Sequence, residues 1–335
     1  VISQAYYRID VYGCINAMGN IDNMILFSVL DKTGFSDSTD YAAGAWDGLH
    51  FHNNAGNKTG TNMHYCQVEY CKALNAGNYK GGGIYVDNYN HLTINHCRIE
   101  NNIAKSSGGG LFSNTGIDIL NSEFNLNKAG QSGGALAFAG DVKPYVDHNI
   151  FYGNFTYQWE INPPPFLSYN TGVGSAVSIH SNQYNETGDI PVFTNNVFYA
   201  NGQYTFYESS YRILIANNIF VNNMGSIFNG HSLSKGIIAN NVFYGNCPLR
   251  LFVISEDYHM VNNIFWENHV LIIFHSVDYL IEPGGVFDGN NEYMHYCNFQ
   301  EEMLQEHQGM ISENPQFVNP PIPLDQIEIS EMFFN

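Results

Sequence analysis

The stretch Asn241-Val242-Phe243-Tyr244-Gly245-Asn246 carries a motif, Asn-(Ile/Val)-Phe-x-x-Asn, that recurs through the second half of the chain. The other copies begin at Asn149, Asn196, Asn218 and Asn263. From the second copy to the last, successive phenylalanines are 22, 23 and 22 residues apart. A fixed period in the twenties predicts a solenoid, in which every repeat forms one turn that stacks on its neighbours.

Weaker copies extend the repeat in both directions. The earlier copies keep a single apolar anchor, at Val68, Ile99 and Phe124. At the C-terminal end we expect the next anchor at Tyr293. The repeat therefore covers most of the chain, which favours one elongated domain over two compact ones.

One interval is irregular, because Phe151 and Phe198 are 47 residues apart, about twice the usual period. Only the segment 176–179, Ala-Val-Ser-Ile, looks like the strand expected in the middle of a turn. We therefore predict one turn that carries a long insertion, over 155–173, rather than two turns.

Short apolar runs with alternating polarity, such as Leu92-Thr93-Ile94 and Ile213-Leu214-Ile215, are separated by Gly and Asn. Before residue 299 no stretch shows the 3.6-residue apolar period of a helix. These features predict an all-β fold, a right-handed parallel β-helix of roughly 9–11 turns, each about 4.8 Å from the next. The expected domain covers 1–318, and 319–335 form a C-terminal tail.

Asparagine recurs at two places in successive turns, where one side-chain amide is expected to donate to the next along the axis. The first column lies two residues before the anchor: Asn149, Asn196, Asn218, Asn241, Asn263. The second lies three residues after it: Asn102, Asn127, Asn154, Asn201, Asn223, Asn246, Asn268. On earlier turns, Cys66 and Cys97 occupy the same position as the first asparagine column. They could form a disulfide, but we favour two buried thiols.

Two further motifs carry a resemblance to a known group. The alternation of Gly133-Gly134-Ala135-Leu136 with Phe124-Asn125-Leu126-Asn127 resembles the repeats of bacterial right-handed parallel β-helix surface proteins, among them polymorphic outer-membrane autotransporter passengers. Trp46-Asp47-Gly48-Leu49-His50-Phe51 resembles the first-turn motif of exported β-helix proteins from Bacteroidota, and Asn314-Pro315-Gln316-Phe317-Val318 resembles their closing segment. The resemblance covers roughly residues 10–318 and implies the fold and an extracellular or outer-surface location. It does not specify a function, because this architecture serves enzymes, adhesins and scaffolds.

Composition narrows the class of partner. The net charge is −19 and the chain has only 12 Lys and Arg, so nucleic acid and anionic membrane surfaces are excluded as expected partners. No apolar run is long enough for a transmembrane segment. The chain begins without Met, in an expected strand at 6–11, so we expect it to be a processed or trimmed product.

A change in the residues beside the anchors predicts a binding face. Neighbours of an inward anchor point outward, and these neighbours are polar before residue 130 and apolar after it. The apolar set forms an aliphatic and a mostly aromatic column: Ile150, Val197, Ile219, Val242, Ile264 and Tyr152, Tyr199, Val221, Tyr244, Trp266. Either the insertion, with Trp159, or the tail covers this face, or it binds a partner protein, a glycan or a second copy of the chain.

Residues suited to catalysis are few. A lyase would need a basic residue near a cation, and Lys80, Asp87, Arg98 and Glu100 are the candidates on early turns. A hydrolase would need two carboxylates about 5–9 Å apart, and Glu69, Glu100 and Glu123 are nearly in register. Charged residues of this kind are more commonly solvated surface groups without a catalytic role.

The acidic loop 31–40 is the one candidate metal site. The loop could bind calcium through Asp31, Asp37 and Asp40, since calcium prefers several oxygen ligands. We favour the alternative, an acidic loop without a bound ion. We therefore predict no cofactor and a non-catalytic, secreted or cell-surface module that binds or scaffolds. The alternative is a polysaccharide lyase or glycoside hydrolase that acts on an extracellular polysaccharide.

Overall fold

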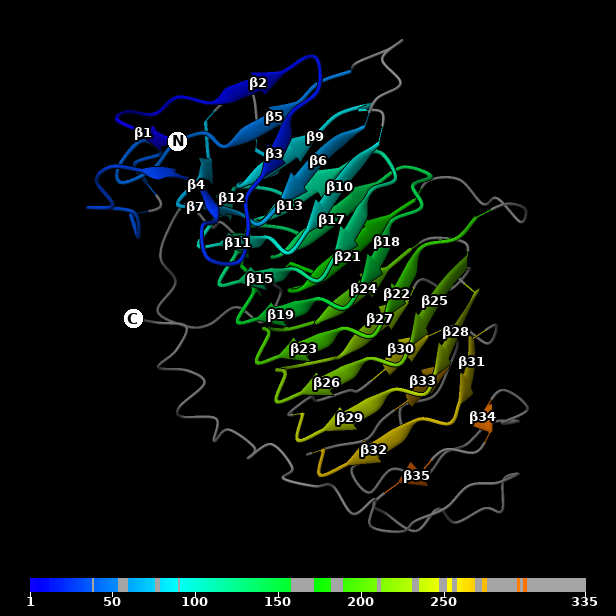
Figure 1. Cartoon of the computed structure of the whole chain (residues 1–335). Helices are drawn as coiled ribbons and strands as arrows, with labels where there is room; N and C mark the ends of the chain where they lie inside the picture. Colours follow the sequence, from blue (N-terminus) through cyan, green and yellow to red (C-terminus); the bar gives the residue numbers. More distant parts are fainter. Residues whose placement is uncertain are drawn as a thin grey trace.

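The computed structural model describes residues 1–268, apart from Ser38, 54–59, 76–78, 90, 158–171, 182–188, 210–211, 231–234, 247–251 and 255–257. It also describes three short strands beyond them, at 273–275, 294–295 and 298–299. Every pairing between the strands is parallel, and each turn of the chain adds one strand to each long sheet (Figure 1). The protein is thus a parallel β-helix, as predicted.

Three long sheets form the walls. Sheet I contains β1 (Ile2–Ser3), β4 (Ile25–Val29), β7 (Cys66–Glu69), β11 (Arg98–Glu100), β15 (Glu123–Asn125), β19 (Ile150–Tyr152), β23 (Val197–Tyr199), β26 (Ile219–Val221), β29 (Val242–Tyr244), β32 (Ile264–Trp266) and β35 (Asn298–Phe299). Sheet II contains β3 (Asn16–Met18), β6 (Thr61–His64), β10 (Leu92–Asn95), β14 (Asp118–Leu120), β18 (Tyr145–Asp147), β22 (Val192–Thr194), β25 (Arg212–Ala216), β28 (Lys235–Ala239), β31 (Tyr258–Val261) and β34 (Met294–His295). Sheet III contains β2 (Ile9–Val11), β5 (Leu49–Phe51), β9 (Ile84–Val86), β13 (Leu111–Ser113), β17 (Leu136–Ala139), β21 (Val177–His180), β24 (Phe206–Glu208), β27 (Phe228–Gly230), β30 (Phe252–Ile254) and β33 (Ile273–His275).

A small fourth sheet lies between sheets I and III in chain order. It contains β8 (Lys72–Ala73), β12 (Ile103–Ala104), β16 (Lys128–Ala129) and β20 (Phe155–Thr156). No helix in the part of the chain that the structure describes has the length and apolarity to cross a membrane.

The corner between sheets II and I is sharp because one residue in each turn has a left-handed backbone. These residues have φ between 47° and 59°: Tyr65, His96, Asn121, His148, Asn195, Asn217, Asn240, Asn262. Asn and His tolerate this conformation better than most side chains, which explains why they recur at this corner.

The predicted anchors form one buried column on sheet I. Phe124, Phe151, Phe198, Phe220, Phe243 and Phe265 pair in direct register. Their ring centroids are 4.6–5.4 Å apart with nearly parallel planes. Because Phe151 pairs directly with Phe198, the long interval is a single turn with an insertion, as predicted.

One anchor was predicted wrongly. The residue paired with Phe265 in the next turn is Phe299, not Tyr293, which lies outside the described residues. Tyr293 was chosen because it lies close to one repeat length after Phe265. The longer connection before β35 moves the next anchor further along the chain.

Both asparagine ladders are present and buried. Each side-chain Nδ2 donates to Oδ1 of the next asparagine across 2.9–3.1 Å, from Asn149 to Asn263 and from Asn102 to Asn268. The first column continues through Ser122 to Cys97 and Cys66, which are buried free thiols. The backbone N–H of Cys66 donates to Sγ of Cys97 across 3.4 Å.

Candidate functional site

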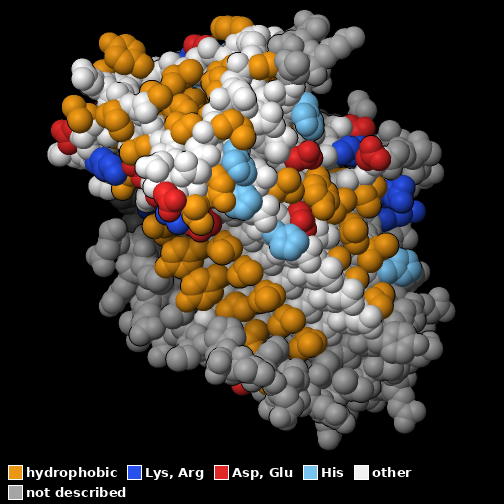
Figure 2. Space-filling model, in the orientation of Figure 1, with side chains coloured by type: hydrophobic (Ala, Val, Ile, Leu, Met, Phe, Trp, Pro, Cys, Tyr) orange, Lys and Arg blue, Asp and Glu red, His pale blue; other side chains and the backbone are white. Residues whose placement is uncertain are grey.

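Sheet I has the predicted apolar face, but fewer of its side chains are exposed than the sequence pattern suggested. Hydrophobic side chains gather in a band over β19–β32 (Figure 2). Ile150 and Ile219 are 44% and 41% exposed, whereas Val221 and Tyr244 are only 5% and 4% exposed. The rest of the two columns is half-buried.

Two aromatic residues of this face, Tyr152 and Tyr199, stack on one another. The rings of Tyr152 and Tyr199 stack with centroids 5.4 Å apart and planes 14° apart, so each covers one face of the other. The Tyr244 hydroxyl donates to the Glu267 carboxylate, and burial together with this acceptor raises the pKa of Tyr244 to about 12. Trp266 is half-buried, and Trp159 lies outside the described residues. A sugar ring that must stack on an open aromatic face therefore has few places to bind here.

The four residues of the lyase hypothesis lie on two different sheets. Lys80 and Asp87 flank β9 in sheet III, whereas Arg98 and Glu100 belong to β11 in sheet I. Arg98 pairs with Glu123 across 3.3 Å. The fold therefore does not bring the four residues together in one cluster.

Glu69 and Glu100 do form a carboxylate pair. They are register partners on β7 and β11, and the Gln67 amide donates to both, across 2.9 and 2.7 Å. Burial and the Glu69 charge raise the pKa of Glu100 above its ordinary value. Glu69 is almost fully buried and also accepts from Ser28 and Lys32.

The acidic loop 31–40 surrounds an internal ammonium group. Lys72, which is fully buried, extends from β8 into this loop. Its Nζ donates to four backbone carbonyl oxygens at 2.8–3.3 Å: Gly34, Asp37, Asp40, Ala43. Each of the three predicted calcium ligands instead accepts a backbone N–H of its own loop, from Thr33, Thr39 and Ala42 respectively. The side chains of Thr33 and Thr39, followed by these backbone donors, lower the pKa of Asp31 and Asp37.

A pocket of about 330 Å³ lies on the outer face of sheet III. It lies beside a column of outward-pointing residues. Tyr85 and Phe112 stack with centroids 5.6 Å apart, and Tyr207 occupies the same column three strands beyond Phe112. The two positions between them hold small side chains, Ala137 and Ser178. Of these column residues, Phe112 and Ala137 line the pocket, and its volume is sufficient for a ligand the size of one sugar ring.

The pocket combines apolar side chains, a cation and several hydrogen-bonding groups. Lys80 Nζ lies over the Phe112 ring, 4.6 Å from its centroid, and His180, from β21, also lines the pocket. His180 Nε2 is 2.8 Å from the Ser178 hydroxyl, and burial together with the Lys80 charge lowers the pKa of His180. Three serines and an amide complete the polar lining: Ser106, Ser107, Ser132, Gln131.

The C-terminal end of the insertion reaches this pocket, and a hydrogen bond joins it to the N-terminal end. Val173 lines it and pairs with Ser132, and the Thr156 hydroxyl donates to the Gly172 carbonyl across 3.1 Å. Of the pocket residues, only Lys80 was singled out in the sequence. The missed signal is the replacement of large outward residues, Tyr85 and Phe112, by Ala137 and Ser178 on the next two turns.

No family model matches this chain, and comparisons with curated proteins and with solved structures give no significant match. The class of the protein, a parallel β-helix, therefore follows from its own strands and ladders.

Proposed function

We propose that this protein is a non-catalytic, extracellular or surface-displayed β-helix that binds a saccharide in the sheet III pocket. The observation that carries this proposal is the pocket of about 330 Å³ beside Phe112 and Ala137, bordered by the Lys80 ammonium. Ligand pockets typically combine apolar side chains with a few placed hydroxyl, amide or charged groups, and this pocket offers Phe112, Ala137 and Val173 beside serine hydroxyls, an amide and the Lys80 ammonium.

The charge distribution specifies the ligand further. A chain with a net charge of −19 repels a polyanion over long distances. Inside the pocket, however, the Lys80 ammonium favours a negative group. We therefore propose a mostly neutral glycan that carries single acidic sugar units, rather than a polyuronate.

Two further elements of the proposal concern location and partner. The resemblance of 46–51 and of the Gly-Gly-Ala and Phe-x-x-Asn repeats to exported Bacteroidota and autotransporter β-helix proteins supports display outside the cell. The apolar face of sheet I, where Ile150 and Ile219 are exposed, supports contact with a partner protein.

A carbohydrate-active enzyme is the second candidate. The Glu69–Glu100 pair favours it, because two adjacent carboxylates with different environments are the requirement for acid-base cleavage of a glycosidic bond. The burial of Glu69 among Ser28, Lys32 and Gln67 argues against it, since a nucleophile or base must reach the sugar.

Calorimetric titration with a panel of oligosaccharides tests the proposal. The panel contains neutral chains, neutral chains with one uronate unit, and polyuronates. We expect binding of the singly acidic chains, weakened about tenfold or more in Lys80→Met, since loss of one charge-assisted contact is typically worth at least about 1.4 kcal/mol. Lys143→Met, which removes a lysine paired with Asp141, is the matched control and should bind normally.

The same samples are then analysed for new reducing ends and unsaturated products. No product is expected. Cleavage that disappears in Glu100→Gln would establish the enzyme instead, and failure of every glycan to bind the native protein would contradict the saccharide proposal.

A further inference from the structure

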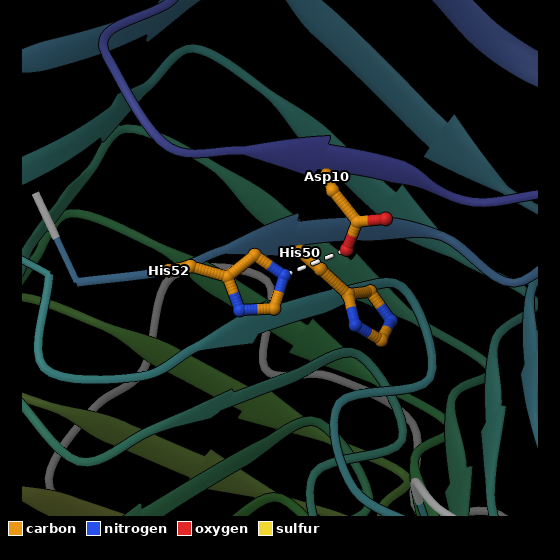
Figure 3. A group of neighbouring side chains, drawn as sticks. All are labelled: Asp10, His50 and His52. Carbon is orange, nitrogen blue, oxygen red and sulfur yellow. Dashed lines mark hydrogen bonds and ion pairs between the residues drawn. The ribbon is translucent and has the colours of Figure 1, made fainter.

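A cluster of metal-ligating side chains lies on sheet III, two strands before the pocket. It contains Asp10 from β2, and His50 and His52 from β5 and the residue after it (Figure 3). One ligand atom from each side chain lies within 4.8 Å of the other two. We propose that these three residues form a binding site for a zinc-class divalent ion.

The backbone explains why the three side chains converge. His50 and His52 are two residues apart on an extended segment, so they project from the same face. Asp10 is the register partner of His50 on the neighbouring strand. The backbone N–H of His52 donates to the Val11 carbonyl across 2.9 Å, which continues the ladder and fixes the position of His52.

The orientation of each ligand is set by a second contact. His50 Nε2 lies 3.0 Å from the Asp47 carbonyl, which can only accept, so this nitrogen carries the hydrogen and Nδ1 carries the lone pair. Histidines that bind metals commonly donate their other nitrogen to a carbonyl in this way. Arg8 binds Asp10 Oδ2 across 3.0 Å, while Oδ1 faces His52.

The ring of His52 is held by Tyr12, which stacks on it at 4.7 Å and 16°, and the ring of His50 packs against Tyr85 at 5.4 Å. His52 Nε2 and Asp10 Oδ1 are 2.6 Å apart. Ligands around a tetrahedral zinc ion are about 3.3 Å apart. To reach this spacing the His52–Asp10 pair has to open by less than an ångström, while the separations from His50, which are at most 4.8 Å, have to match it.

The donor set selects the kind of metal. Two imidazoles and one carboxylate, already paired with Arg8, offer too few oxygens and too little negative charge for calcium or magnesium. Imidazole donors suit zinc and its neighbours, and three protein ligands leave a fourth position for water or a ligand. The ion would join β2 to β5 and would lie in the same outward column, His50–Tyr85–Phe112, that leads to the pocket.

Isothermal titration of the chelator-treated protein with zinc chloride tests the site. We expect one tight equivalent of zinc, a higher melting temperature in its presence, and loss of both effects in His52→Ala and Asp10→Asn. His52 and Asp10 are not buried, so both variants should fold, which their melting temperatures in the chelator will verify.

His64→Ala in combination with His96→Ala is the matched control. These two rings are 5.3 Å apart at the corner of sheets I and II, away from Asp10, and their loss should leave zinc binding unchanged. The proposal is overturned if the native protein binds no stoichiometric zinc, if His52→Ala binds as the native protein does, or if only the His64/His96 variant loses the ion.

Discussion

The ammonium group of Lys72 donates to the carbonyl oxygen of Asp37 across 2.8 Å, inside the acidic loop that follows β4. Three more carbonyls of the same loop accept from the same nitrogen. The loop therefore folds around a cation that the protein supplies itself, and its carboxylates turn outwards to hold the loop's own backbone.

Removal of this ammonium should loosen the loop. Lys72→Met keeps the length of the side chain but leaves four carbonyls without their donor, and we expect a loss of about 2–4 kcal/mol in the free energy of unfolding. Urea unfolding measures the loss, and limited proteolysis should show earlier cleavage within 31–45. Lys105→Met, at an exposed position, should stay within about 0.5 kcal/mol of the native protein. Equal stability of the two variants would contradict this role of Lys72.

The phenylalanine column should make a large contribution to stability. Phe220 is 1% exposed between Phe198 and Phe243, so Phe220→Ala leaves a cavity in the middle of the stack. We expect a loss of about 3–5 kcal/mol, measured by urea unfolding. A loss below about 1 kcal/mol would mean that the rings do not pack as described.

The asparagine ladder is expected to act as structure, not as a binding site. Asn218 Nδ2 donates to Asn241 Oδ1 across 3.1 Å, and Asn218 Oδ1 accepts from Asn196 across 3.0 Å. Asn218→Ala leaves buried amides unpaired and should cost about 1–3 kcal/mol. The neighbouring Asn217 is exposed with φ of 59°, so Asn217→Gly should be nearly neutral. Indistinguishable melting temperatures for these two variants would refute the ladder's contribution at this turn.

The raised pKa of Glu100 predicts a pH-dependent stability. This carboxyl binds its proton more tightly in the folded state than in the unfolded state. The folded protein therefore loses stability as the pH rises from the unfolded pKa of the carboxyl, about 4.3, through its higher folded pKa. Glu100→Gln removes this loss and can still accept from Gln67. The variant should therefore be more stable than the native protein at pH 7 and gain little at pH 4, as measured by urea midpoints. A gain that is equal at both values would argue against the carboxylate pair.

The sequence predicted those features that repeat in every turn. The anchors, both ladders and the single long insertion follow from identical residues at a constant spacing, since parallel stacking aligns equal positions. The error at Tyr293 arose where a long connection interrupts the spacing. There the better signal was Cys297, two residues before Phe299, as Cys66 and Cys97 precede their own anchors.

The sites were harder to predict because they join turns of unequal length. Lys80, Phe112 and His180 meet only once the register of three separate turns is known. Likewise, nothing in the pattern around Asp10 indicates that it lies opposite His50, forty residues later. The apolar columns of sheet I were found correctly, but their partial burial depends on ring stacking that the sequence does not reveal.

The most direct test of the proposed function is to fill the pocket. Ala137 lines the pocket beside Phe112, so Ala137→Trp should place an indole where the sugar is expected to bind. Calorimetric titration with the singly acidic oligosaccharide should show complete loss of binding in this variant and normal binding in Tyr199→Ser, which alters only the face of sheet I. Retained binding in Ala137→Trp, with loss in Tyr199→Ser, would contradict the account and place the ligand on the apolar face.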